Sequence, residues 1–330
     1  MFKNSVVSHR VAFEAAGLVA LADLSTVAMR TALTGTASYL DTLVLAPGMH
    51  QQQSADEVNR SETPTTGAMT NGYVFRVENP ATVRYLQKIG CTGHLVTARV
   101  SQNPSLDDNL SRYNRRIQSF RVAGIFATIL YLLCPVLTIS VFAVLGAIED
   151  WWGFGVLWML VLARLINVII IKRRSHMGWK GAHEIGQGDL LVLLSQDRWV
   201  RLQGSVDDLK AVTAGQWLRE MSDKESFAVA FATLLVYLSA ALAGNASEVG
   251  SLLIAGLLLC SVALLGLCNS MTKCLQMYNC VVCTEGEPKK YERRLDMADD
   301  LIDMTKSEDW AIRMGLIIPT GGLSKRSDTL

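Results

Sequence analysis

The sequence predicts a mainly α fold: a four-helix transmembrane bundle made of two hairpins, with a cytosolic N-terminal region, a structured cytosolic insert and a helical C-terminal tail. Two observations predict this fold. Residues 122–148 contain no Asp, Glu, Lys or Arg, and a bilayer core about 30 Å thick needs about 20 apolar residues to cross it. Charged residues make up only 18% of the chain, whereas soluble domains carry about a quarter.

Four apolar stretches are long enough to cross a bilayer, and they form a first hairpin (122–171) and a second hairpin (226–271). The predicted spans are 122–148, 153–171, 227–244 and 249–271. Within each hairpin, only a few residues separate the two spans. We therefore expect no folded domain on the far side of the membrane.

The basic residues that flank the spans predict how the chain is threaded. Loops rich in Lys and Arg stay on the cytosolic side. Basic clusters precede the first span, follow the second span and follow the fourth; their residues are Arg112, Arg115, Arg116, Arg121, Lys172, Arg173, Arg174, Lys180, Lys273, Lys289, Lys290, Arg293 and Arg294. All fall on one side, so we expect both termini and the insert in the cytosol, where these clusters could also attract anionic lipid headgroups.

The N-terminal region (1–111) has three predicted parts. Apolar residues at helical spacing predict a helix within residues 1–32. Residues 47–72 are rich in Gln, Ser and Thr and predict a flexible linker. Residues 73–100 predict a strand at 73–77, a helix capped by Asn79 and a second strand at 94–100. This folded piece is too small to be a catalytic domain by itself.

The cytosolic insert (172–225) and the tail (272–330) both have helical signals. In the insert, strands at 189–194 and 199–202 precede a helix at 206–221 that Ser205 caps. In the tail, an amphipathic helix at 291–306 precedes a short helix that contains Trp310 and ends at Gly315, and the last residues, 319–330, are expected to be disordered. We expect the insert to contact the tail.

Arg164 is the only ionisable side chain inside a predicted span, and a charge there costs at least about 2.5–3.5 kcal/mol unless it is paired or hydrated. Pro135 frees the carbonyl of Tyr131 from its helical hydrogen bond. Arg164 and Tyr131 lie at similar depths, roughly 11 and 14 Å from the cytosolic side. We expect Arg164, with Asn167 beside it, to satisfy the broken turn; a binding site for an anion or headgroup is the alternative.

The seven cysteines are expected to be reduced thiols, because those outside the spans fall in the predicted cytosolic regions. Cys280 and Cys283 have the spacing of a zinc ligand pair, but no complete set of four ligands accompanies them. Cys274, directly after the fourth span, is a candidate for lipidation. We therefore predict no metal site and no cofactor.

No catalytic motif is present, so we name no catalytic residue, and the question of enzymatic activity stays open with a preference against it. Gly186 to Asp189 match the GxGD pattern of intramembrane aspartyl proteases, but Asp189 lies in the polar insert and has no second intramembrane aspartate.

The net charge of +1 gives no reason to expect a nucleic acid partner. Small residues spaced four apart in the spans suit close helix packing, and homo-oligomers are left open.

Two parts of the chain carry a resemblance to other proteins. The run from Gly178-Trp179-Lys180-Gly181 to Gln216-Trp217-Leu218-Arg219 and the tail pieces Tyr291-Glu292-Arg293-Arg294-Leu295 and Asp309-Trp310-Ala311-Ile312-Arg313 resemble uncharacterised fungal integral membrane proteins with no assigned activity. The resemblance covers roughly residues 122–318. It implies a membrane protein whose insert is part of the fold.

Two functions follow from these observations. The first is a non-enzymatic interaction or organising protein, held in the lipid bilayer, whose insert and tail recruit an unknown cytosolic protein. The second is a small transporter or channel subunit that uses Arg164 and the helix break at Pro135. The predicted spans contain no acidic residue and few polar residues, which favours the first.

Overall fold

The computed structural model describes residues 22, 25–52, 54–103 and 124–318, and these form two compact units that each combine several segments. The described parts of Met1–Ser54, Pro104–His176 and Trp217–Lys273 form the first, which we call the helical unit. The described parts of Ala55–Asn103, Met177–Gln216 and Cys274–Leu330 form the second, which we call the sheet unit.

Four helices of the helical unit are long and apolar enough to cross a membrane, as predicted. They are α6 (Ile125–Ala147), α7 (Trp151–Arg174), α9 (Asp223–Leu242) and α10 (Glu248–Met271). Their ends follow local capping chemistry: Asp150 accepts from the Gly153 N–H at the start of α7, and Ser247 accepts from the Gly250 N–H at the start of α10. A short 3₁₀ helix, η3 (Ala243–Asn245), extends α9.

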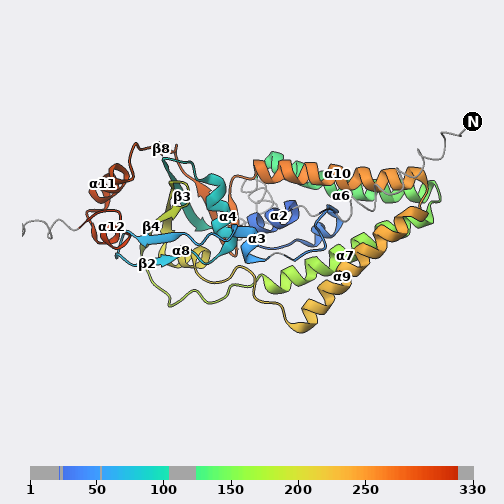
Figure 1. Ribbon diagram of the computed structural model, residues 1–330, viewed down its shortest axis with the longest axis horizontal. Helices are drawn as coiled ribbons and strands as arrows, with labels where there is room; N and C mark the ends of the chain where they lie inside the picture. Colours follow the sequence, from blue (N-terminus) through green and yellow to red (C-terminus); the bar gives the residue numbers. More distant parts are fainter. Residues whose placement is uncertain (1–21, 23–24, 53, 104–123, 319–330) are drawn as a thin grey trace, which may run out of the picture. The chain divides into compact units, whose positions relative to one another are not determined.

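The helices pack in two close pairs. α6 lies along α10 and α7 lies along α9, so each close pair joins one helix from each predicted hairpin (Figure 1). Large apolar side chains on all four helices point outward, among them Phe126, Trp158, Phe227 and Leu252. A soluble protein rarely exposes so large an apolar surface, and this surface is compatible with lipid contact.

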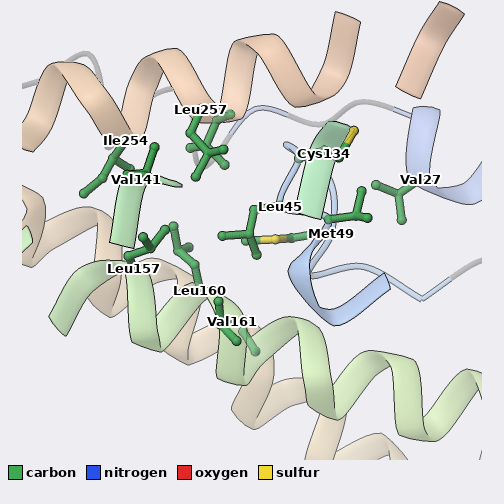
Figure 2. Packing of buried hydrophobic residues seen from close by; sticks show 14 of the residues in the cluster. Val27, Leu45, Met49, Cys134, Val141, Leu157, Leu160, Val161, Ile254 and Leu257 are labelled. Carbon is green, nitrogen blue, oxygen red and sulfur yellow. The ribbon is translucent and has the colours of Figure 1, made fainter. Parts of the chain in front are cut away.

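The N-terminal segment of the helical unit packs among these helices. It contains α2 (Thr26–Thr34), which overlaps the end of the region 1–32 where we predicted a helix, and the 3₁₀ helix η1 (Tyr39–Leu43). The rest of that predicted helix lies outside the described residues. Leu45 and Met49 are fully buried between the helices (Figure 2). We call residues 38–52 the buried segment.

The sheet unit contains an eight-stranded mixed sheet, which the expectation of a mainly α protein omitted. The strands run β2-β1-β4-β5-β3-β7-β6 across the sheet, and β8 also pairs with β3. Their bounds are β1 Thr65–Ala68, β2 Val74–Arg76, β3 His94–Gln102, β4 Gln187–Leu194, β5 Arg198–Ser205, β6 Leu275–Met277, β7 Cys280–Thr284 and β8 Lys289–Lys290.

The sheet joins three segments that are distant in sequence. β3 pairs in parallel with β5, which comes from the insert, and in antiparallel fashion with β7, which comes from the tail. β1 pairs with β4. The four predicted strands are therefore present as β2, β3, β4 and β5, but they belong to one sheet that no single segment could build.

The stretch 47–72, expected to be a flexible linker, is structured. It contains the end of the buried segment, the helix α3 (Ala55–Asn59) and the strand β1. The polar composition of this stretch did not predict a strand, because β1 has few apolar side chains of its own. Thr66 is nevertheless fully buried, since β1 pairs with β2 on one side and β4 on the other.

Two helices of the sheet unit begin where their caps predicted. Asn79 caps α4 (Pro80–Ile89), and Ser205 accepts from the Asp208 N–H at the start of α8 (Val206–Thr213). However, α8 is shorter than the predicted helix at 206–221: Ala214 leaves the helical conformation, and Gly215 follows with a positive φ of 70°. Trp217 instead lies in the helical unit, where its indole N–H donates to the Gly35 carbonyl at 2.8 Å.

The tail helices α11 (Arg294–Thr305) and α12 (Asp309–Arg313) pack on the sheet. The cluster that joins them is Met69, Leu95, Leu191, Trp199, Met297, Leu301, Trp310 and Ala311. The predicted contact between insert and tail is thus confirmed for the strands of the insert. The amphipathic helix predicted at 291–306 begins later than expected, at Arg294, and it buries Met297, Ala298 and Leu301.

Candidate functional sites

Arg164 is buried in α7, with only 3% of its surface exposed. Its Nε donates to the backbone carbonyl of Asp41 at 3.1 Å, whereas we expected it to meet the carbonyl of Tyr131. Pro135 lies inside α6, which continues through it. The Nη1 atom of Arg164 is buried and has no hydrogen-bond partner among the described residues.

Asp41 connects the buried segment to the predicted site. Its carboxylate accepts from the Tyr131 hydroxyl at 2.7 Å and from the Ser38 N–H at 2.6 Å, which also caps η1. The guanidinium of Arg30 lies 4.9 Å from the centre of the Tyr131 ring. No predicted span contains an acidic residue. The carboxylate at this site therefore comes from Asp41, in the buried segment.

Asn167 holds the other end of the buried segment. Its side-chain amide donates to the Met49 carbonyl at 3.2 Å and accepts from the Gln52 amide at 2.6 Å. Gln52 in turn accepts from Arg174 at 2.9 Å. The structure thus links Arg164 and Asn167 through one segment, but each side chain meets a different end of it.

Further side chains satisfy carbonyl groups of the buried segment. The Thr138 hydroxyl of α6 donates to the Leu43 carbonyl at 2.7 Å, and the Thr233 hydroxyl of α9 donates to the His50 carbonyl at 3.3 Å. Non-helical backbone at membrane depth is stable only where protein or water replaces its missing hydrogen bonds. Three of the four long helices supply such donors here, so the polar cluster fixes the buried segment in place.

A second polar cluster joins the turns between the helices. The Asp150 carboxylate accepts from the hydroxyl of Ser247 at 2.6 Å and from its N–H at 2.9 Å. Partial burial opposes ionisation, but the hydrogen bonds from Ser247 and Gly153 hold the pKa of Asp150 below its usual value. Gly250 lies against this carboxylate, since a Cβ at that position would stand 2.0 Å from Asp150 Oδ2.

The sheet unit contains a groove of about 820 Å³ beside strand β2. We call it the β2 groove. Its apolar floor and walls include Tyr73, Phe75, Leu190 and Leu209. Its charged residues are Arg76, Glu78, Lys180, Glu184, Lys210 and Arg313. A concave site of this size with aromatic walls and a few charged groups is typical of a binding site. The sequence analysis missed it because its walls come from all three segments.

Asp189, which completes the GxGD pattern, has a structural role in the sheet unit. It lies in β4, and its carboxylate accepts from Arg201 Nε at 2.9 Å and from Gln203 at 3.0 Å. The hydrogen bond with Asp189 raises the pKa of Arg201, although partial burial of the guanidinium opposes this. A carboxylate held in this way is not placed for acid–base chemistry.

Cys274 is bonded to Cys283 in a disulfide across the start of the β6–β7 hairpin. This differs from the expectation of reduced thiols. A lipid could be attached to Cys274 only after the disulfide was reduced, so lipidation stays a prediction. Cys280 is buried, and burial together with the nearby Asp208 carboxylate raises its pKa to about 12.

No protein-family model, curated protein or solved structure matches this chain. The resemblance to fungal membrane proteins therefore stays a prediction.

Proposed function

We propose that the chain is an integral membrane protein with both termini, and the sheet unit, in the cytosol. The four apolar helices and their outward apolar side chains support membrane insertion. The sheet supports the threading: β3 pairs with both β5 and β7, and two of the four helices separate each of these strands from the next along the chain. The basic clusters beside the spans favour the cytosolic side. The Cys274–Cys283 disulfide of the sheet unit argues against it, because disulfides are rare in cytosolic proteins, and we give the basic clusters the greater weight.

The function that we propose is that of an interaction or organising protein whose sheet unit recruits a cytosolic partner protein. The observation that carries this proposal is the β2 groove, an open site on a folded unit that is tied to the spans at several points along the chain. The basic residues beside the spans would add contacts with anionic lipid headgroups.

A transporter or channel subunit is the second candidate, and the buried segment favours it. Transporters place irregular backbone and buried charges within the membrane, and in this chain the buried Arg164 of an apolar helix donates to the backbone carbonyl of Asp41 in the buried segment. Against this candidate, the carbonyl groups described above are occupied by fixed side chains, and the apolar core between the helices is well filled. We therefore rank it second.

Two measurements separate the candidates. Proximity labelling from the C-terminus should mark a reproducible set of cytosolic proteins, and the set should shrink when the β2 groove is altered by Tyr73→Ala with Phe75→Ala. Purified protein in liposomes should carry no flux of ions or small solutes above that of empty liposomes. Flux that is present in the native chain and lost in Arg164→Ala would overturn the ranking.

A further inference from the structure

Strand β2 forms one edge of the sheet, and its outer side is open. The Ala68 N–H donates to the Tyr73 carbonyl at 2.8 Å, and the Val77 N–H donates to the Pro64 carbonyl at 3.1 Å. Residues 73, 75 and 77 therefore direct their main-chain groups toward β1. Main-chain groups alternate along a strand, so those of Val74 and Arg76 point outward, where no described strand pairs with β2.

The β2 groove begins at this open edge. The Tyr73 and Phe75 rings stack with their centres 5.8 Å apart. Phe75 pairs with Thr66, and Ala68 pairs with Leu190, so the two rings lie on the sheet face that carries Leu190. On that face α8 packs against β3, β4, β5 and β7. The part of this face that β1 and β2 form lines the groove.

The charges that line the groove select for an acidic occupant. Four of the lining residues are cationic (Arg76, Lys180, Lys210 and Arg313) and two are anionic (Glu78 and Glu184). Lys210 is paired with Glu184 at 2.7 Å, and Lys180 with Asp207 at 3.6 Å, so the positive charge open to a ligand comes from Arg76 and Arg313. Arg76 is exposed on the edge strand and forms no ion pair with another described residue. The groove therefore presents a surplus of positive charge beside an open strand edge.

We propose that the edge of β2 and the β2 groove bind an extended acidic segment of a partner protein, which pairs with β2 as an added strand. In this mode main-chain hydrogen bonds supply affinity and alternate side chains supply specificity. One apolar side chain of the partner would fill the space between the Tyr73–Phe75 pair and Leu209, and carboxylates would meet Arg76 and Arg313. This inference rests on the proposed recruiting function and names the class of partner.

The test uses the full chain in phosphatidylcholine nanodiscs and a random dodecapeptide library displayed on phage. We expect enriched peptides in which Asp or Glu alternates with apolar residues. A fluorescein-labelled copy of the strongest peptide then reports affinity by polarisation. Arg76→Glu should weaken binding about tenfold or more, because it replaces an attraction with a repulsion. Val74→Pro should weaken it similarly, because it removes an outward N–H that an edge strand can lose without unfolding.

Arg293→Glu is the matched control, since Arg293 is an exposed arginine of the sheet unit that does not line the groove. It should leave binding unchanged. A library without acidic enrichment, or binding that both groove variants leave intact, would overturn the inference. Binding that falls with Arg76→Glu but survives Val74→Pro would also overturn it, in favour of a ligand held by side chains alone. If the inference fails while groove-dependent proximity labelling persists, the recruiting function stands.

Discussion

Asp41 is an acidic residue packed against the apolar helices, and it belongs to the buried segment, not to any of the four long helices. It accepts a hydrogen bond from Tyr131, and its backbone carbonyl meets Arg164. An arginine alone in hydrocarbon is costly, and a fixed carbonyl with a carboxylate nearby lowers that cost. The predicted pair of Arg164 and Tyr131 was thus close to the right place, but the residue that joins them lies far away in sequence.

The first prediction tests this junction with a double-mutant cycle on Asp41→Asn and Tyr131→Phe. Tyr131→Phe alone should cost about 1–2 kcal/mol, because it leaves a buried acceptor without its donor. The two changes should be non-additive by about 0.5–3 kcal/mol. The unfolding free energy in mixed micelles measures both. Fully additive effects would show that the hydrogen bond contributes nothing.

The second prediction concerns Gly250. A Cβ there would lie 2.0 Å from Asp150 Oδ2, so Gly250→Ala should displace the carboxylate from Ser247 and cost about 1–3 kcal/mol. Gly256→Ala on the same helix is the control, because a Cβ at Gly256 meets nothing within 4 Å. Thermal unfolding in nanodiscs compares the two. Equal melting temperatures would contradict the close packing at Gly250.

At the scale of elements, the long helices and the helix caps could be predicted from the sequence, whereas the buried segment could not. The four long helices follow from composition alone, and the caps at Asn79 and Ser205 follow from local patterns. Residues 43–46 (Leu-Val-Leu-Ala) form an apolar run too short to cross a bilayer, followed by Pro47 and Gly48. This run is much shorter than the roughly 10–14 apolar residues typical of a re-entrant segment, so only the donors on neighbouring helices show where it lies.

The third prediction tests how this segment is held. Asn167→Ala removes donors to the carbonyls of Met49 and His50. Amide hydrogen exchange of residues 38–52 should therefore become at least about tenfold faster, as local opening loses hydrogen bonds worth about 1 kcal/mol each. Ser140→Ala is the control, because the Ser140 hydroxyl bonds only to its own helix, at Val136. Unchanged exchange in Asn167→Ala would show that packing alone holds the segment.

The fourth prediction concerns the tail. Hydrogen bonds from Lys289 and then Tyr291 hold the pKa of Asp300 below its usual value. A carboxyl whose pKa is lower in the folded state stabilises the fold above its unfolded pKa, about 3.9, and loses that effect as the pH falls through the folded value. The melting temperature of the sheet unit should fall below about pH 4, and the fall should be shallower in Asp300→Asn. Identical pH profiles would contradict this coupling.

At the scale of the whole molecule, the sheet was the least predictable part. Periodicity identified β2, β3, β4 and β5 one by one, but it carries no information about pairing between strands a hundred residues apart. β1 was missed because its residues are Thr, Gly and Ala, and β6 to β8 because they are only two to five residues long. The partners of a strand come from tertiary packing, which composition does not record.

The fifth prediction tests the threading. Cys91 is exposed and lies in the sheet unit. In sealed vesicles, a membrane-impermeant maleimide should label Cys91 and a cysteine introduced by Met177→Cys from the same side. A cysteine introduced by Trp151→Cys, at the start of α7, should be labelled only from the other side. Labelling of Cys91 and the Trp151→Cys site from one side would overturn the proposed topology.

The position of β3 in the middle of the sheet has a consequence for biosynthesis. The ribosome makes β3 before any of the four long helices, but β5 appears only after two of them and β7 only after all four. If one helix failed to insert, a later strand would emerge on the wrong side of the membrane and β3 would keep an unpaired edge. Unpaired edges attract chaperones and promote aggregation. Closure of the sheet would thus act as quality control, so that only correctly threaded chains escape degradation.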